Sequence, residues 1–289
     1  MEGQNTAKKV GLVLEGGGMR GIYTAGVLDV FMEHGLSFDG VIGVSAGAIH
    51  GCSFVSGQVG RGIRYYKKYC RDSRFMSFRN VVKTGDMVDE QFCYHELPDT
   101  LDPFDHEAFR NSGTKFYVTC TNLETGKAEY VHLTDMRRQI DLLRASASLP
   151  YVSRVVECGG KKLLDGGCTD SIPVNAFMKM GYERNVVVLT RCREYVKEPE
   201  HATLAKVYYR QYPRFAAAMK NRHKVYNNTR KLIRRLQEEG KAFVINPSHS
   251  LAIGRVCRDP EKIQEVYDLG RQDAIRQLGN LELFMEQSR

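Results

Sequence analysis

The sequence predicts an α/β protein in which a largely parallel central sheet is flanked by helices, giving a three-layer sandwich. Short apolar runs alternate with longer segments whose apolar residues recur at helical spacing. Glycine-rich turns close several of these runs, and such alternation is typical of a parallel sheet with helices on its faces. A chain of 289 residues with 42% hydrophobic content is long enough to bury one large core.

The N-terminal part of the chain predicts two strands, each followed by a helix. Residues 10–14 form an apolar run that ends at glycines, which favours a buried strand. A glycine loop then leads into a helix over 22–34, for which Gly35 is a suitable C-terminal cap. Residues 41–44 predict a second strand, and the small apolar residues 46–55 predict a buried helix.

The middle of the chain changes in character. Residues 56–113 mix aromatic and charged residues with prolines, and they resemble a lid or inserted loops more than core. Residues 115–121 and 128–133 then alternate as strands, and residues 135–145 predict a helix.

The rest of the chain divides at about residue 195. Its predicted elements are a hairpin over 155–164, a helix opening at 171–173, a strand over 186–189, a helical segment over 204–219, a strand over 242–245 and a helix capped by Asp259. We therefore expect an α/β domain over 1–195 and a basic, helical C-terminal extension with a late strand over 196–289. We expect the extension to pack on the same domain.

The composition restricts the compartment and the chemistry. The N-terminus shows no apolar leader with a cleavage site, and no apolar run approaches the about 18 residues that span a bilayer. We therefore expect a cytoplasmic protein. The eight cysteines are scattered without a C-x-x-C pair, so we expect neither a metal site nor a disulfide framework. We also expect no cofactor.

Residues 43–47, Gly-Val-Ser-Ala-Gly, match the G-x-S-x-G pattern of a nucleophile elbow. Such an elbow requires a strand, a serine on a strained turn and then a helix, and the elements predicted around Ser45 meet this requirement. The small residues on either side of Ser45 suit a sharp, closely packed turn. Because the pattern is common, an ordinary turn between strand and helix is the alternative.

The loop 16–21, Gly-Gly-Gly-Met-Arg-Gly, has two functional interpretations. It matches the dinucleotide fingerprint G-x-G-x-x-G, but that site needs an acidic residue after the second strand, where this chain has Ser45. The other interpretation is an oxyanion hole, in which glycine N–H groups and a helix N-terminus face an acyl carbonyl. Arg20 would add positive potential beside it. A purely structural turn remains a third interpretation.

A serine nucleophile also requires a base. Three histidines follow the serine in the chain, none of them in a motif: His201, His223 and His249. Asp165 closes the predicted strand 162–164, so its carboxylate would lie at the same sheet edge as Ser45. The sequence Asp-Gly-Gly is also a common turn, which is the alternative interpretation.

Together these motifs resemble the patatin-like phospholipase family, over about residues 10–190. The resemblance rests on the glycine loop, on residues 43–47, on Asp165-Gly166-Gly167 and on the small-residue block 145–150, all in the family's order. In that block the family tends to have alanine where this chain has Ser148. The tail from about residue 200 resembles an extension found in a bacterial branch.

The resemblance implies a Ser-Asp dyad in which Ser45 attacks an acyl carbonyl and Asp165 accepts its proton. It implies that N–H groups of Gly17 and Gly18, joined by that of Ala46, hold the oxyanion. The predicted site is therefore catalytic Ser45 and Asp165 with an oxyanion loop of Gly16, Gly17, Gly18, Arg20, Gly21 and Ala46.

The expected activity is hydrolysis of lipid acyl esters by a serine acyl hydrolase of phospholipase or lysophospholipase type. The alternatives are a catalytically weak lipid-binding or regulatory protein that keeps the fold, and a nucleotide-binding oxidoreductase that uses the glycine loop. The intact Ser45 and Asp165 argue against the former, and the missing acidic residue argues against the latter.

The net charge of +8 is unevenly distributed. Lys and Arg recur from Lys206 to Arg235 without an acidic residue, which favours attraction to an anionic surface. We expect peripheral contact between the segment 206–235 and an anionic membrane, and a solvated helix face is an equal alternative. No nucleic-acid partner is expected, because the chain shows no recognition module.

Overall fold

The computed structural model, which describes residues 8–199, 202–254 and 256–287, contains one eight-stranded sheet. The strands are β1 (Val10–Leu14), β2 (Gly40–Val44), β3 (Lys115–Asn122), β4 (Lys127–Leu133), β5 (Val156–Cys158), β6 (Lys161–Asp165), β7 (Arg184–Val188) and β8 (Ala242–Ile245). Their order is β5-β6-β3-β2-β1-β7-β8, and β4 pairs with β3. Five neighbouring strands are parallel, namely β3, β2, β1, β7 and β8. The pairings of β4 and β6 with β3, and of β5 with β6, are antiparallel.

Helices cover both faces of the sheet. They are α1 (Gly21–Glu33), α2 (Ala46–Val55), α3 (Arg61–Tyr69), α4 (Phe78–Thr84), α5 (His106–Asn111), α6 (Met136–Ala147), α7 (Val174–Lys179), α8 (Ala202–Tyr208), α9 (Pro213–Glu238) and α10 (Pro260–Glu286). Shorter turns are η1 (Gly18–Arg20) and η3 (Gly166–Cys168), and η2 (Phe92–Leu101) is a π-helix. The α/β fold predicted from the sequence, with its largely parallel central sheet, is confirmed.

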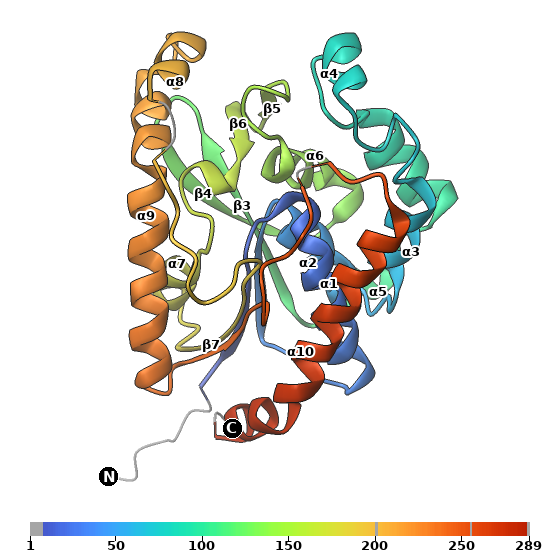
Figure 1. The fold of residues 1–289 in the computed structure, drawn as a ribbon, viewed down its shortest axis with the longest axis vertical. Coiled ribbons are helices and arrows are strands. Elements are labelled where there is room, and N and C mark those ends of the chain that lie inside the picture. Colours follow the sequence, from blue (N-terminus) through green and yellow to red (C-terminus); the bar gives the residue numbers. More distant parts are fainter. Residues whose placement is uncertain (1–7, 200–201, 255, 288–289) are drawn as a thin grey trace.

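Alternate side chains of β1 divide the core into two layers, because successive residues of a strand point to opposite faces. Leu12 and Leu14 belong to the cluster that includes α1 and α10, whereas Val13 belongs to the cluster with α7 and α9. Figure 1 shows α1, α2 and α10 on one side of the sheet and α7 and α9 on the other. None of the described helices combines the length and apolarity needed to cross a membrane.

The prediction of inserted loops over residues 56–113 is wrong, since this segment contains α3, α4, η2 and α5. Aromatic residues in it, such as Tyr65, Phe92 and Phe104, are buried in the main core cluster. The helices escaped detection because they are short, and because the π-helix with Pro98 inside it does not repeat every 3.6 residues.

The C-terminal extension contributes to the same sheet and the same core. β8 pairs in parallel with β7, and α10 packs along α1. Glycines allow the two helices to approach closely: a Cβ on Gly26 would overlap the carbonyl oxygen of Tyr267, and one on Gly270 would overlap that of Tyr23. The extension is therefore fitted to the first helix of the chain by residues on both sides.

We expect Gly270→Ala to lower the free energy of unfolding by about 1–3 kcal/mol, since the added methyl group separates α10 from α1. Gly279→Ala is the matched control, because it lies in the same helix and its Cβ would meet no atom within 4 Å. The control should be neutral or more stable by up to about 1 kcal/mol. Denaturant unfolding measures both, and equal stability of the two variants would contradict the close approach.

Candidate active site

Strands β2 and β6 lie end to end along the same edge of β3. Thr119 of β3 pairs with Val44, the last residue of β2. The next residue, Cys120, pairs with Asp165, the last residue of β6. Because β2 is parallel to β3 and β6 is antiparallel to it, the two strands run toward each other. The sheet register therefore brings Ser45, which follows Val44, beside Asp165.

Ser45 occupies a strained backbone conformation between β2 and α2. Its φ of 54° and ψ of −124° lie outside the regions that most side chains adopt. Close packing holds this conformation in place: a Cβ on Gly43 would lie 2.6 Å from the backbone of Ala48, and one on Gly47 would lie 2.6 Å from the carbonyl oxygen of Leu14. These contacts explain why glycines flank the serine.

The small-residue block at the end of α6 fastens both halves of the site. The N–H group of Ser45 donates to the hydroxyl of Ser146 at 3.0 Å, and this hydroxyl donates to the carbonyl of Thr119 at 2.7 Å. The N–H group of Asp165 donates to the carbonyl of Ser148 at 2.8 Å. The block therefore ties the serine turn and the aspartate strand to the same helix end.

The Asp165 carboxylate is almost fully enclosed, with 4% of the residue exposed. Its Oδ1 accepts the N–H group of Gly167 at 2.7 Å, whereas Oδ2 has no aligned hydrogen-bond partner among the described residues. Burial raises the pKa of Asp165, and the nearby Ser45 hydroxyl, the Arg222 guanidinium and the Gly167 N–H oppose that rise. A raised pKa makes a carboxylate a better proton acceptor.

Arg222 reaches this site from the C-terminal extension. Its Nε donates to the carbonyl of Gly167 at 2.5 Å, directly after the aspartate strand. Its positive charge also lowers the pKa of Asp165. From the sequence alone Arg222 was one of many cations in the basic segment, and no local signal distinguishes it from its exposed neighbours.

Glu15 is a second residue of the site that sequence reasoning missed. It lies between β1 and the glycine loop and is 2% exposed. Its carboxylate accepts the N–H group of Thr190 at 2.6 Å and the hydroxyl of Tyr226 at 2.7 Å. Glu15 thereby joins the loop to the end of β7 and to α9.

The N–H groups of the predicted oxyanion loop divide into two sets. That of Gly16 donates to a main-chain carbonyl before α7 at 3.3 Å, and that of Gly21 donates within η1. In the described part of the chain no hydrogen bond uses the N–H groups of Gly17, Gly18 or Ala46. The last of these groups lies at the N-terminus of α2, where the helix dipole favours negative charge.

Arg20 lies beside Glu15 and Arg191 and is not among the residues that line the cavity above Ser45. Burial and the neighbouring Arg191 lower the pKa of Arg20, and Glu15 opposes this change. The positive potential that we expect from Arg20 beside the glycine loop is thus opposed by the buried carboxylate of Glu15.

A cavity of about 560 Å³ opens above the serine. Gly18, Ser45 and Ala46 line its floor, and apolar residues from α2, α3, η2 and α6 form its walls, including Ile49, Tyr65, Leu97, Ile140 and Leu143. The size and the apolar lining are typical of a pocket for a small organic ligand.

Ser45 is the only serine among the described residues that line this cavity. The two cysteines that share the lining, Cys52 and Cys93, are poor nucleophiles, because burial raises the pKa of Cys52 to about 11 and also raises that of Cys93. Within the described ranges, no three His, Cys, Asp or Glu side chains gather as metal ligands.

Two of the three histidines considered as bases lie among the described residues. His223 and His249 do not line the cavity, and His201 lies outside the described residues. His95 and His106 do line it, and burial lowers the pKa of His106. Of the predicted bases, the sheet register brings Asp165 next to the serine.

The fold and the site define an α/β protein with a serine on a strand-turn-helix elbow, a buried aspartate beside it and an apolar cavity above. The model of the patatin-like phospholipase family matches residues 12–178, which is more than half of the chain, and the chain belongs to that family. A second model, described as a domain of unknown function (DUF6363), matches residues 212–286.

Curated relatives match over the N-terminal part of the chain. The uncharacterized protein YjjU of Escherichia coli K12 is 33% identical over 186 residues, covering 63% of this chain and 52% of YjjU. Lysophospholipase NTE1 of Debaryomyces hansenii is 29% identical over 187 residues, covering 63% of this chain and 12% of NTE1. The chain thus spans about half of the first relative and a small part of the second.

Among solved structures, VipD from Legionella pneumophila matches with a TM-score of 0.47 and 14% identity. The match covers 94% of this chain and 67% of the VipD chain.

Proposed function

We propose that the protein hydrolyses lipid acyl esters, with Ser45 as the nucleophile and Asp165 as the base. One observation carries the proposal: a strained serine lines the floor of an apolar cavity, and the register of β3 brings a buried aspartate beside it. The family and the name of the NTE1 relative, a lysophospholipase, support a phospholipase or lysophospholipase type of reaction.

In the proposed reaction, Ser45 Oγ attacks the acyl carbonyl carbon while Asp165 accepts the hydroxyl proton. The N–H groups of Gly17, Gly18 and Ala46 stabilise the negative charge that develops on the carbonyl oxygen. The carbon–oxygen bond to the alcohol then breaks, and the alcohol leaves with the proton from Asp165. Water attacks the acyl-enzyme, gives a proton to Asp165, and releases the fatty acid as Ser45 is reprotonated.

The cavity suits an acyl chain. Its walls are mainly aliphatic and aromatic, so an extended hydrocarbon would replace water there. With the ester at Ser45, the chain would run between η2 and α6, which contribute Leu97 and Leu143 to the lining. We therefore place the fatty acyl group in the cavity and the alcohol part of the lipid outside it.

The predicted contact between segment 206–235 and an anionic membrane stays a proposal, and the structure narrows its residues. Arg222 is engaged with Gly167, and Arg230 is buried and donates to the carbonyl oxygens of Cys192 and Arg193. The basic side chains that remain exposed lie both on α8 and along α9, among them Lys206, Lys220, Lys224 and Lys231.

A fluorophosphonate probe tests the proposed function, because it phosphonylates activated serines. We expect the native chain to be labelled on the peptide that contains Ser45, and we expect no labelling of Ser45→Ala. Ser112→Ala is the matched control, since Ser112 is exposed and lies after α5, and it should label like the native chain. A folded native chain that resists the probe, or equal labelling of Ser45→Ala, would refute the assignment.

A further inference from the structure

Helix α4 presents two large apolar side chains to solvent. Phe78 is 65% exposed and Val82 is 90% exposed. They lie four residues apart, so they occupy the same face of the helix. In Figure 1, α4 stands at the top of the molecule, across from α8. Adjacent exposed apolar side chains of this size mark a surface that another molecule covers.

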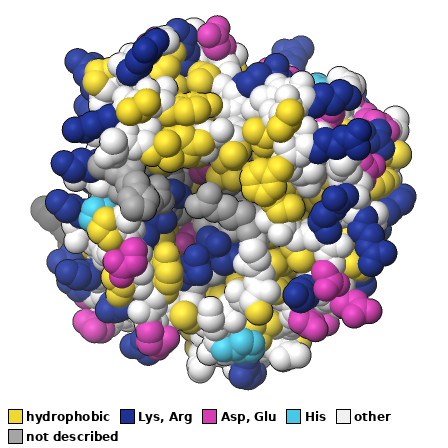
Figure 2. Space-filling view, turned by 45° about the horizontal axis from the view of Figure 1, so that its top comes forward, with side chains coloured by type: hydrophobic (Ala, Val, Ile, Leu, Met, Phe, Trp, Pro, Cys, Tyr) yellow, Lys and Arg dark blue, Asp and Glu magenta, His cyan; other side chains and the backbone are white. Residues whose placement is uncertain are grey.

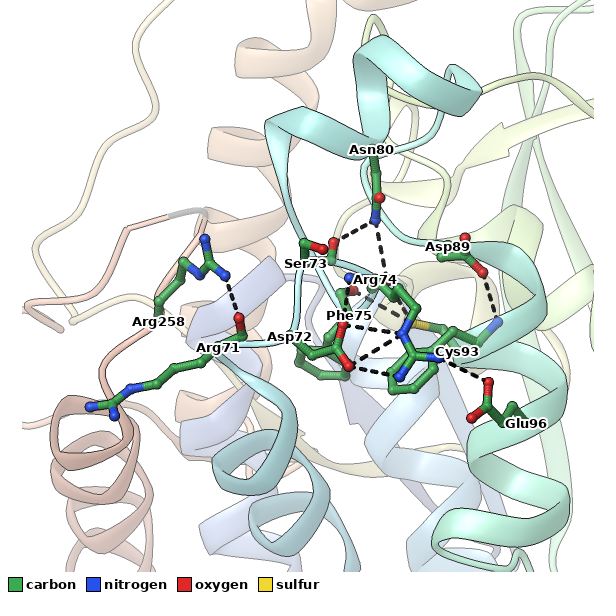
Figure 3. A network of polar contacts seen from close by, with 11 residues as sticks. Arg71, Asp72, Ser73, Arg74, Phe75, Asn80, Asp89, Cys93, Glu96 and Arg258 are labelled. Carbon is green, nitrogen blue, oxygen red and sulfur yellow. Dashed lines mark hydrogen bonds and ion pairs between the residues drawn. The ribbon is translucent and has the colours of Figure 1, made fainter.

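The helix is held firmly, so the exposure does not come from a loose tip. The Asn80 side chain donates to the carbonyl oxygens of Ser73 and Arg74 at 2.7 and 3.2 Å. Arg74 in turn forms ion pairs with Asp72 and Glu96. Figure 3 shows this network tying the segment before α4 to η2. Phe78 and Val82 are therefore displayed on a fixed support.

Four exposed basic side chains lie near the two apolar ones. Arg79 and Lys83 directly follow them in α4, and Arg71 and Arg258 line a surface depression together with Phe78. The carboxylates nearest in sequence have other partners: Asp72 pairs with Arg74, Asp86 pairs with Arg154, and Asp259 accepts the N–H group of Glu261. None of the four cations forms an ion pair with a described carboxylate, although Arg258 donates to the main-chain carbonyl of Arg71 (Figure 3). The surface therefore combines apolar side chains with basic side chains that form no ion pair with a described carboxylate.

This surface shares a wall with the Ser45 cavity. Phe75 and Met76, which directly precede α4, line the cavity. Met76 also lines a surface depression together with Arg71, Arg79 and Arg258. A molecule bound in this depression would therefore contact Met76, which also lines the Ser45 cavity.

We propose that α4 docks the protein on an anionic lipid bilayer, with Phe78 and Val82 inserted among the lipids and the four basic side chains against lipid phosphates. A bilayer presents a hydrocarbon region beneath a layer of negative charge, which matches an apolar pair with basic side chains beside it. Figure 2 shows the face reached by turning the top of Figure 1 forward, where hydrophobic side chains gather and Lys and Arg lie around them.

This inference rests on the proposed function and deepens it, because it names an anionic bilayer as the source of the lipid. It also differs from the contact proposed for segment 206–235, which involves α8. That helix exposes Leu204 and Val207, at 55% and 69%, and it supplies the competing surface in the experiment.

Vesicle flotation of the full chain tests the docking surface. Vesicles of phosphatidylcholine alone are compared with vesicles that also contain phosphatidylglycerol, at low and high salt. We expect the native chain to float with the anionic vesicles, and we expect Phe78→Ser/Val82→Ser to bind them at least about tenfold more weakly. Arg79→Glu/Lys83→Glu should lose a similar factor. The control Ile275→Ser/Leu283→Ser changes two exposed apolar residues of α10, at 53% and 56%, and should bind normally.

Two assays separate this inference from the proposed function. Neither Phe78 nor Val82 lines the cavity, so their double variant should cleave a soluble short-chain ester normally but release less fatty acid from anionic vesicles. Unchanged flotation of that variant, or loss of flotation only in Leu204→Ser/Val207→Ser, would overturn the role of α4. Flotation without cleavage of any ester by the native chain would instead refute the hydrolase and leave the docking surface supported.

Discussion

Asp165→Asn is expected to lower the turnover of a soluble short-chain ester by about 10³-fold or more, as loss of a general base does. Asparagine keeps the size of the side chain. It also keeps an oxygen that can accept the Gly167 N–H group, which in the native chain lies 2.7 Å from Asp165 Oδ1. It does not accept a proton from Ser45 at neutral pH. Steady-state kinetics of the purified variant, with circular dichroism to confirm folding, measures the effect.

The pH dependence provides an independent check on this assignment. Burial raises the pKa of Asp165, so turnover by the native chain should fall as the pH drops through that raised value and the carboxylate becomes protonated. The raised pKa also means that ionised Asp165 destabilises the folded state at pH values above its unfolded pKa. Asp165→Asn should therefore lack the acid limb and unfold at the same or a higher temperature at neutral pH.

Histidine variants supply the controls for the base. We expect His223→Ala and His249→Ala to keep native turnover, because neither side chain lines the cavity and neither acts on the pKa of the Asp165 carboxylate beside Ser45. His95 and His106 do line it, so their alanine variants test the remaining imidazoles near Ser45. Loss of turnover in a histidine variant, together with retained turnover in Asp165→Asn, would show that the base is misassigned.

Gly17→Ala is expected to lower turnover by about 10²-fold through displacement of the glycine loop. The φ of Gly17 is −156°, so a left-handed backbone is not what excludes a side chain here. The obstacle is Thr190, whose Oγ1 would lie 2.8 Å from the new Cβ. Moving the loop away from Thr190 would move the N–H groups of Gly17 and Gly18 relative to Ser45. The kcat for a soluble ester is the appropriate measurement.

Relief of the clash provides the control for Gly17→Ala. Thr190→Ala removes Oγ1 and Cγ2, the two Thr190 atoms nearest to the new Cβ, and keeps the main-chain N–H that donates to Glu15. The double variant Gly17→Ala/Thr190→Ala should therefore recover most of the lost turnover. If the double variant is as slow as Gly17→Ala alone, the loop acts through something other than its position against Thr190.

The sequence predicts those parts of the site that depend on neighbouring residues. The apolar runs locate the strands, and the small residues around Ser45 indicate the turn, where Gly43 is required by a contact with Ala48, which lies close to it in the chain. The bounds of α2 and β8 agree with the prediction to the residue.

The remaining parts depend on contacts between residues far apart in the chain. The meeting of Ser45 and Asp165 follows from the pairing of β2 and β6 with adjacent residues of β3, and no local pattern encodes that register. The same holds for Glu15, whose partners Thr190 and Tyr226 lie 175 and 211 positions away. The family resemblance supplies the dyad where the local pattern alone leaves the base undecided.

The attachment of Arg222 to Gly167 has a consequence for how such proteins diverge. The segments that two separate family models match are chemically linked, because a side chain of the tail lowers the pKa of the carboxylate beside Ser45. Substitutions in the C-terminal extension can therefore change the pKa of Asp165 while every motif residue stays unchanged. Exchanging the C-terminal extensions of two relatives would therefore change the pKa of the aspartate beside the serine.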